Sequence, residues 1–426
     1  MNPTTIPAPK LALSGIRPTF GGLASGACWT IAASIAAAVS QWLLLMVAAK
    51  LGSTEMVGQM ALSLAVVAPI QSFTDLALRP ALATDASREF HFRDYLRLRA
   101  IMIGVAILAA GVAAFWRGGP AAWIIMAIGL QKAVESGSDV FFGLFQREER
   151  LKWMGQSVVL RSILTSVAFA GVMFAMRNLL WACLASLVVR LGIFLLHDVA
   201  RGARLPQFRT DGARRSQIGR LLWSSLPLAG GVFLMSFTVN IPRYFVEQRM
   251  GVAALGVFAA LIYVFQAGAM LVDAAAQAAC VRLARYHLAD DRSSFQGLMT
   301  GLAGLAAAAA GCGIVIALAG GGPLLKTVYS AVFAHESEAF LWLSVCALPW
   351  YCSSVLGYAL VARRQMVGLF HCQAACLAVT VAGSYWLIGG KSLIDACRIV
   401  FLTYSVLTAL YGFVLWRGPS EGETSG

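Results

Sequence analysis

Long apolar stretches recur along almost the whole chain, and short polar segments separate them. A helix needs about 20 apolar residues to cross the hydrocarbon layer of a membrane, and twelve stretches reach roughly this length. The sequence therefore predicts an all-α polytopic membrane protein. The predicted spans are residues 24–49, 56–78, 98–116, 120–145, 153–176, 179–198, 219–242, 252–280, 297–319, 338–361, 366–388 and 393–416.

The composition supports the same class of protein. Only 12% of the residues are charged and 59% are hydrophobic, whereas soluble domains carry about 25% charged residues. A soluble enzyme, a disordered protein and a nucleic-acid-binding module are therefore excluded.

The formal net charge of +13 is explained by where the basic residues lie. With the N-terminus in the cytoplasm, the inner segments hold about three times as many Lys and Arg residues as the outer segments, which is the bias of cytoplasmic loops. We therefore expect both termini in the cytoplasm. The basic balance requires no nucleic acid as a partner.

The two halves of the chain resemble each other. Each half contains a basic residue shortly before a glycine, then a second glycine, and then an acid at the same distance. The aligned parts are segment 41–52 with segment 240–251, Gly58 with Gly256, and Asp75 with Asp273. Because each half has an even number of spans, the repeats are expected to be parallel, giving two six-helix lobes with a substrate cavity between them.

This repeat divides the chain into five parts. A cytoplasmic tail, the N-lobe, a basic cytoplasmic linker, the C-lobe and a second cytoplasmic tail follow one another. Their expected ranges are 1–23, 24–198, 199–218, 219–416 and 417–426.

Charged residues inside the spans of the N-lobe are the first candidates for a functional site, because charges are costly in a membrane. Lys132, Glu135 and Asp139 share one face of a predicted helix, and Arg161 and Arg190 lie at similar depth in the next two spans. One interpretation is a polar cavity in which the basic groups bind an anionic substrate and the acids take up a coupling proton or cation. The other is a structural cluster in which Lys132 pairs with Glu135, and Arg161 or Arg190 with Asp139.

Three further charged residues are candidates. Asp75 and Asp273 occupy equivalent positions of the repeat near the inner ends of their spans, as gating residues or as partners of arginines such as Arg79 and Arg282. Arg243 is expected at the outer end of the seventh span, where it either meets a substrate headgroup or anchors the helix at the interface.

The seventh span also carries a predicted hinge. Pro227 removes a backbone hydrogen bond and Gly230 and Gly231 add conformational freedom, so this helix is expected to bend. Close packing against a neighbouring helix is the competing explanation for the glycines.

Signatures of catalysis and of metal binding are weak. The chain has no phosphate-binding loop of the GxxxxGK[ST] type, and its outer loops are too short for the domain with which lipid-linked glycosyl polymerases and ligases hold an acceptor. Cys372 and Cys376 lie four residues apart beside His371, but thiols are common packing residues. We expect no enzyme activity, no metal and no cofactor other than a possible proton or sodium gradient.

Several segments resemble one known superfamily. They are Gln41-Trp-Leu-Leu-Leu with Ala49-Lys-Leu-Gly-Ser and Gly58, then Asn240-Ile-Pro-Arg-Tyr-Phe with Gly251 and Leu255-Gly-Val-Phe-Ala-Ala, and finally Ala284-Arg-Tyr with Asp290-Asp-Arg. They are similar to polysaccharide exporters and O-antigen flippases of the Wzx type, in the multidrug/oligosaccharidyl-lipid/polysaccharide exporter superfamily. The likeness covers most of residues 24–416. The chain departs from it at Ile241-Pro242, where members often have an acid, and in its twelve spans, since some members have fourteen.

The resemblance implies a function and a location. Two six-helix lobes would form a V in the bacterial inner membrane and move an undecaprenyl-diphosphate-linked oligosaccharide across it by alternating access, for O-antigen, capsule or exopolysaccharide synthesis. Membrane lipids, a polymerase and a chain-length regulator are the implied partners. A cation-coupled drug or metabolite exporter of the same superfamily is the main alternative, and a glycosyl polymerase or ligase is a second one.

The expected topology can be tested at Arg209, within the predicted cytoplasmic linker. In a background without native cysteines, Arg209→Cys is expected to react with a membrane-impermeant thiol reagent only from the cytoplasmic side. Labelling from the outer side alone would contradict the topology.

Overall fold

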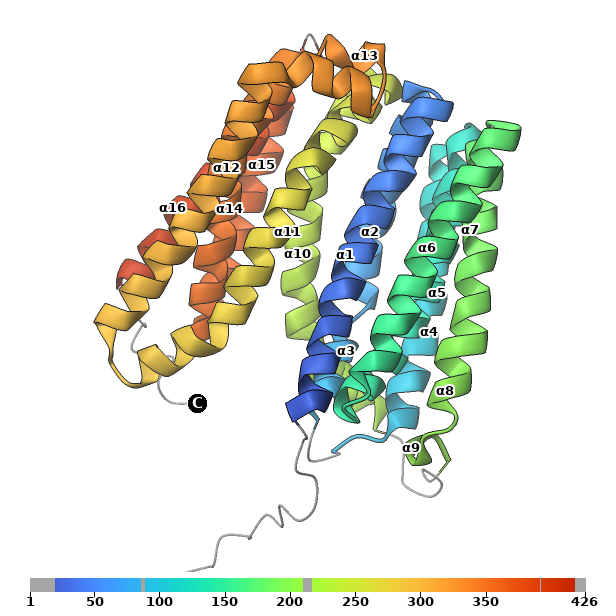
Figure 1. The fold of residues 1–426 in the computed structure, drawn as a ribbon, viewed down its shortest axis with the longest axis vertical. Helices are drawn as coiled ribbons and strands as arrows, with labels where there is room; N and C mark the ends of the chain where they lie inside the picture. Colours follow the sequence, from blue (N-terminus) through green and yellow to red (C-terminus); the bar gives the residue numbers. More distant parts are fainter. Residues whose placement is uncertain (1–19, 86–88, 210–216, 391, 418–426) are drawn as a thin grey trace, which may run out of the picture.

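The computed structural model of the protein describes residues 20–85, 89–209, 217–390 and 392–417. Within these ranges twelve long helices run along one common direction, and no strand occurs (Figure 1). They are α1 (Phe20–Leu51), α2 (Thr54–Thr74), α4 (Phe92–Arg117), α5 (Gly119–Arg147), α6 (Leu151–Met176), α7 (Leu179–Ile193), α10 (Ile218–Met250), α11 (Val252–Leu288), α12 (Arg292–Val328), α14 (Ser337–Ala362), α15 (Met366–Leu387) and α16 (Leu393–Arg417).

Short helices complete the described part of the chain. A π-helical segment (Phe194–Val199) and α8 (Ala200–Gly202) extend α7, and α3 (Leu78–Thr84), α9 (Pro206–Arg209) and α13 (Ala331–Ala334) lie in connections between long helices. The predicted tails 1–23 and 417–426, and the centre of the predicted linker 199–218, lie largely outside the described residues.

The predicted fold class is confirmed. Eleven helices among the described residues are long and apolar enough to cross a membrane, and α5, which carries the predicted charged face, is the twelfth long helix. The predicted spans are right in number and order. Several helices are longer than predicted, because regular hydrogen bonding continues past the apolar stretch into polar flanks, as in α4, which begins at Phe92 rather than near residue 98.

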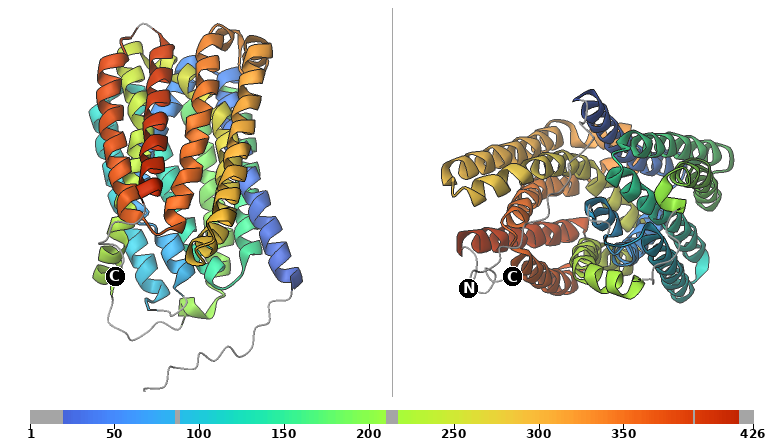
Figure 2. Two further views of the ribbon diagram at one scale, coloured as in Figure 1. Left: turned by 90° about the vertical axis from the view of Figure 1, so that its left-hand side faces the viewer. Right: turned by 90° about the horizontal axis from the view of Figure 1, so that it is seen from below.

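The helices form two lobes arranged as a V (Figures 1 and 2). Helices α1 to α7 make one lobe and α11 to α16 lie in the other. The lobes approach each other at the upper end of Figure 1 and diverge at the lower end, where α1 begins and α16 ends.

At the upper end the backbones of α2 and α11 touch. A Cβ atom added to Gly58 would lie 1.8 Å from the carbonyl oxygen of Val252, and one added to Gly256 would lie 2.1 Å from that of Thr54. Side chains larger than hydrogen are therefore excluded at both glycines, which are equivalent positions of the sequence repeat. This contact joins the two lobes.

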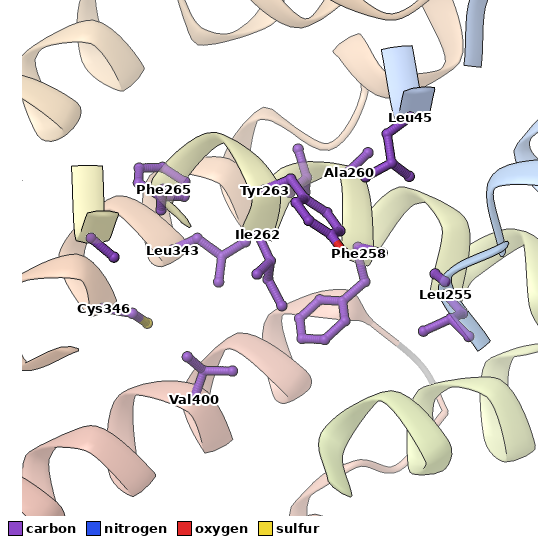
Figure 3. Close-up of a cluster of buried hydrophobic side chains, with 14 of the residues drawn as sticks. Leu45, Leu255, Phe258, Ala260, Ile262, Tyr263, Phe265, Leu343, Cys346 and Val400 are labelled. Carbon is purple, nitrogen blue, oxygen red and sulfur yellow. The ribbon is translucent and has the colours of Figure 1, made fainter. Parts of the chain in front are cut away.

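A continuous apolar core surrounds the contact. Leu45 of α1, Leu255 and Phe258 of α11, and Val400 of α16 are all buried in it (Figure 3). The core thus extends from the first lobe into the second rather than ending at the boundary between them.

Helix α10 follows the linker in sequence but contacts both lobes. It packs on α2 as well as on α15 and α11. The Tyr244 hydroxyl donates a hydrogen bond to the Ala65 carbonyl oxygen at 2.5 Å. At its two ends, Glu247 pairs with Arg117 of α4 and Arg220 pairs with Glu89 at 2.6 Å.

The predicted hinge region lies inside α10, which is helical from Ile218 to Met250. A Cβ atom added to Gly230 or Gly231 would meet nothing within 4 Å, so close packing does not explain these glycines. A break of helical geometry does occur at Gly320 of α12, shortly before Pro323. The hinge at Pro227, Gly230 and Gly231 stays a prediction.

Alanine at the interlobe glycines should destabilise the protein. Gly58→Ala or Gly256→Ala places a methyl group against backbone, and such overpacking costs about 1–3 kcal/mol. Thermal unfolding in detergent should show a lower midpoint for both variants. Gly230→Ala with Gly231→Ala is the matched control, because the space there is open and alanine favours helix by roughly 1 kcal/mol per residue. An equal loss in the control would contradict the role assigned to the interlobe contact.

Candidate functional site

A cavity of about 120 Å³ lies inside the first lobe, between α1, α2, α5, α6 and α7. Four charged side chains line it: Lys132 and Glu135 of α5, Arg161 of α6 and Arg190 of α7. The structure therefore brings together four of the five charged residues that the sequence placed at similar depth. Ser40, Gln41, Gln131, Ser162 and Ser186 add neutral polar groups to the wall.

Glu135 is the centre of the ion pairs in this cavity. Its Oε2 atom lies 2.9 Å from Lys132 Nζ and 3.4 Å from Arg190 Nη1. The predicted pair of Lys132 with Glu135 is present. Arg190 pairs with Glu135 rather than with Asp139, because α7 faces α5 about one turn above the aspartate.

Arg161 has no such partner. Its side chain is buried, its guanidinium lies over the Phe142 ring at 5.5 Å from the centroid, and it forms no ion pair among the described residues. Its buried Nη1 atom has no hydrogen-bond partner in that part of the chain. An unpaired buried donor is costly, so Arg161 is suited to an anion that enters the cavity.

The charges of the cavity do not cancel. Three cations face one carboxylate, which leaves a formal excess of two positive charges. A guanidinium binds the oxygens of a phosphate through two parallel hydrogen bonds, which a lysine cannot do. The cavity can therefore attract and orient a phosphate or diphosphate group.

Asp139 lies outside this cavity, contrary to the predicted cluster. Its Oδ1 atom is 3.4 Å from Nη1 of Arg79. The reason is α3, a short helix that the sequence did not predict and that brings Arg79 beside the lower part of α5. The predicted pairing of Asp75 with Arg79 is consequently absent.

Asp75 belongs to a separate polar network. Arg99 of α4, whose side chain is 2% exposed, donates to Asp75 Oδ1 at 2.5 Å and to Ser136 Oγ at 2.7 Å. Gln71 and Ser136 also donate to the same carboxylate. The network connects α2, α4 and α5 through hydrogen bonds and an ion pair, so its role is structural. Arg99 stands at the inner end of the predicted span 98–116 and was not among the candidates singled out from the sequence.

Arg243 and Asp273 line a second cavity, inside the second lobe. Arg243 was expected at the end of its span, but α10 continues to Met250, so the side chain is buried within the helix bundle. Its Nη1 atom donates to Asn240 Oδ1 at 3.0 Å. Asp273 accepts a hydrogen bond from the Ser354 hydroxyl and, among the described residues, pairs with no cation, including Arg282.

The cysteine pair has a packing role in the structure. Cys372 and Cys376 are buried, and Cys376 Sγ contacts the Thr403 carbonyl oxygen at 3.4 Å. Within the described ranges no group of three or more His, Cys, Asp and Glu side chains could hold a metal ion.

Each of the two lobes encloses a cavity, a charged one in the first lobe and a mostly apolar one in the second, and solved structures of known transporters have the same fold. Lipid II flippase MurJ, in an inward closed conformation, matches with a TM-score of 0.70 and 8% identity over 93% of this chain and 88% of that chain. An inward-facing multidrug resistance MATE family transporter of the MOP superfamily matches with a TM-score of 0.68 and 12% identity over 89% of this chain and 93% of that chain.

One relative links this fold to polysaccharides. The capsular polysaccharide biosynthesis protein CapF of Staphylococcus aureus is 22% identical over 389 residues, which cover 90% of this chain and 97% of the relative. No protein-family model matches the chain. The fold is thus that of MOP superfamily transporters, and the resemblance stated from the sequence is confirmed. The two solved structures are those of a flippase and of a transporter, in agreement with the prediction that the protein is not an enzyme.

The ion pairs predict different stabilities for two variants of the cavity. Glu135→Gln leaves Lys132 and Arg190 without a counter-charge, and losing a partner in such a partly buried pair costs roughly 1 kcal/mol or more. Arg161→Gln removes a cation that forms no ion pair among the described residues but lies over the Phe142 ring, so it should lower stability less than Glu135→Gln does. The thermal midpoint in detergent should fall more for Glu135→Gln than for Arg161→Gln. The reverse order would show that Arg161 is the structural residue.

Proposed function

We propose that the protein is a flippase for an undecaprenyl-diphosphate-linked oligosaccharide. The observation that carries the proposal is the excess of cations in the first-lobe cavity, where Arg161 and Arg190 present guanidinium groups beside Lys132. The diphosphate of such a lipid is the anion that these groups suit. The acids Glu135, Asp139, Asp75 and Asp273 stay candidates for coupling or gating, with a proton or sodium gradient as the driving force.

Alternating access is the proposed mechanism. The lobes touch at Gly58 and Gly256 and diverge toward the lower end, so the helices of the two lobes are farther apart at that end. We place the lower end, with both termini, in the cytoplasm of a bacterium, and the upper end outside the inner membrane. Binding of the lipid headgroup between the lobes would then precede their separation at the upper end.

The relatives support a polysaccharide substrate. CapF is a capsular polysaccharide biosynthesis protein and MurJ is a lipid II flippase. Capsule, O-antigen or exopolysaccharide synthesis is therefore the proposed pathway class, with a polymerase and a chain-length regulator as proposed partners. The alternative, a cation-coupled exporter of drugs or metabolites, would favour a cavity dominated by acids rather than by three cations and one acid.

Flipping assays test the role of the arginines. The probe is the lipid-linked repeat unit extracted from cells that lack the transporter, reconstituted with purified protein in liposomes. Arg161→Ala and Arg190→Ala should slow flipping about 10–100-fold, since a hydrogen bond to a charged group contributes roughly 1.5–3 kcal/mol. Arg161→Lys and Arg190→Lys should retain part of the rate, because lysine keeps the charge but loses the planar fork.

The matched control is Arg292→Ala. Arg292 pairs with Asp290 at a position where both side chains are 85% exposed, so its loss should leave flipping unchanged. Full flipping by both cavity variants, at equal amounts of folded protein, would leave Arg161 and Arg190 as structural residues and refute the proposed substrate site.

A further inference from the structure

The second lobe holds a cavity of about 270 Å³ between α10, α11, α14, α15 and α16. In the sequence repeat these helices are the counterparts of α1, α2, α5, α6 and α7, which line the cationic cavity of the first lobe. The duplicated fold therefore contains two equivalent cavities. Their linings differ in the number of charged and of aromatic side chains.

Aromatic side chains dominate the second-lobe cavity. Trp350 stacks on Tyr404 with ring centroids 5.1 Å apart and planes at 12°, and Tyr358 and Tyr411 also line the space. The first-lobe cavity has Phe169 as the one aromatic residue in its described lining. The second cavity thus presents ring faces where the first presents guanidinium and ammonium groups.

The polar groups of the second cavity are mostly neutral and partly unused. The hydroxyls of Tyr358 and Tyr404 and the indole N–H of Trp350 make no hydrogen bond to other described residues. Gln373 donates to the Tyr411 hydroxyl at 2.7 Å. Among the described residues, Ser354 is the one group that donates a hydrogen bond to the Asp273 carboxylate. The carboxylate can therefore accept further hydrogen bonds.

These features together match a sugar. A pyranose has apolar C–H faces that stack on aromatic rings, and hydroxyl groups at its edge that must be hydrogen-bonded when they leave water. A mostly apolar cavity with a few placed polar groups is the usual form of a specific small-molecule site. An isoprenoid chain would instead leave three donors without partners and the Asp273 carboxylate with Ser354 as its one donor among the described residues. A diphosphate would meet one cation, Arg243, and one opposing carboxylate.

We infer that the second-lobe cavity binds the glycan of the lipid-linked substrate while the first-lobe cavity binds its diphosphate. This inference rests on the proposed flippase function and divides the substrate between the two halves of the duplication. Trp350 and Tyr404 provide the ring surface on which the sugar stacks. Asp273 and the tyrosine hydroxyls form hydrogen bonds with the hydroxyl groups of the sugar. The anionic group that all such lipids share is then bound in one lobe, and the part that differs between them is bound in the other.

Binding measurements with three probes test the inference. The first probe is the lipid-linked repeat unit from cells without the transporter, the second is the oligosaccharide released from it by mild acid, and the third is sugar-free undecaprenyl diphosphate. Titration calorimetry in detergent should show that wild-type protein binds the intact lipid more tightly than the sugar-free lipid. Asp273→Asn and Tyr404→Phe should weaken binding of the intact lipid and of the free oligosaccharide about tenfold and leave the sugar-free lipid unaffected.

Two further variants distinguish a failure of the inferred glycan site from a failure of the proposed function. Tyr385→Phe, at an exposed tyrosine of α15 outside the cavity, should change none of the three affinities, and thermal midpoints show whether each variant is folded. Arg161→Ala should weaken both lipids and spare the free oligosaccharide. Equal wild-type affinity for the intact and sugar-free lipids, or weaker binding of the sugar-free lipid by Tyr404→Phe, would overturn the glycan site. Unchanged binding of both lipids by Arg161→Ala would instead overturn the proposed function.

Discussion

The approach of α2 to α11 at Gly58 and Gly256 determines the geometry of the whole molecule. Each glycine lacks the side chain that would strike the backbone of the other helix, so two helices from different lobes touch directly. Helices in a membrane gain little from burying apolar surface against one another, and small residues that allow close approach supply the contact instead. Because this contact lies toward one end of the helices, the lobes can separate at the other end, and each lobe keeps its own internal cavity.

Much of the fold follows from the sequence because the membrane restricts the options. A backbone without water must satisfy its own hydrogen bonds, so long apolar stretches become helices and their number can be read directly. The repeat was visible because Gly58 and Gly256, and Asp75 and Asp273, keep equivalent positions. Helix α3 and the burial of Arg243 were not visible, because each depends on neighbours that are distant in sequence. The break at Gly320 lies in the local run Gly320-Gly-Gly-Pro, a helix-breaking signal that the hydropathy pattern does not register.

The charged residues of the first lobe show which side-chain contacts can be predicted from the spacing of residues along a helix and which cannot. Lys132 and Glu135 are neighbours on one helix and were paired correctly. Asp139 shares the same face, yet its partner is Arg79, because the chain turns at the end of α2 in a way that hydropathy does not encode. Arg99 was not singled out from the sequence, and the structure shows it buried against Asp75. Ion pairs of one cation with one carboxylate thus hold the helices together. The first-lobe cavity around Arg161 instead has more cations than carboxylates.

The contacts of helix α10 limit where two homologous proteins of this fold can be joined into a chimera. It opens the second half of the predicted sequence repeat, yet it is held to the first lobe by Tyr244 on Ala65 and by the pairs of Glu247 with Arg117 and Arg220 with Glu89. A chimera joined at the linker would therefore transfer a helix without its partner residues. The repeat unit of the sequence and the unit that can be exchanged between homologous proteins are not the same.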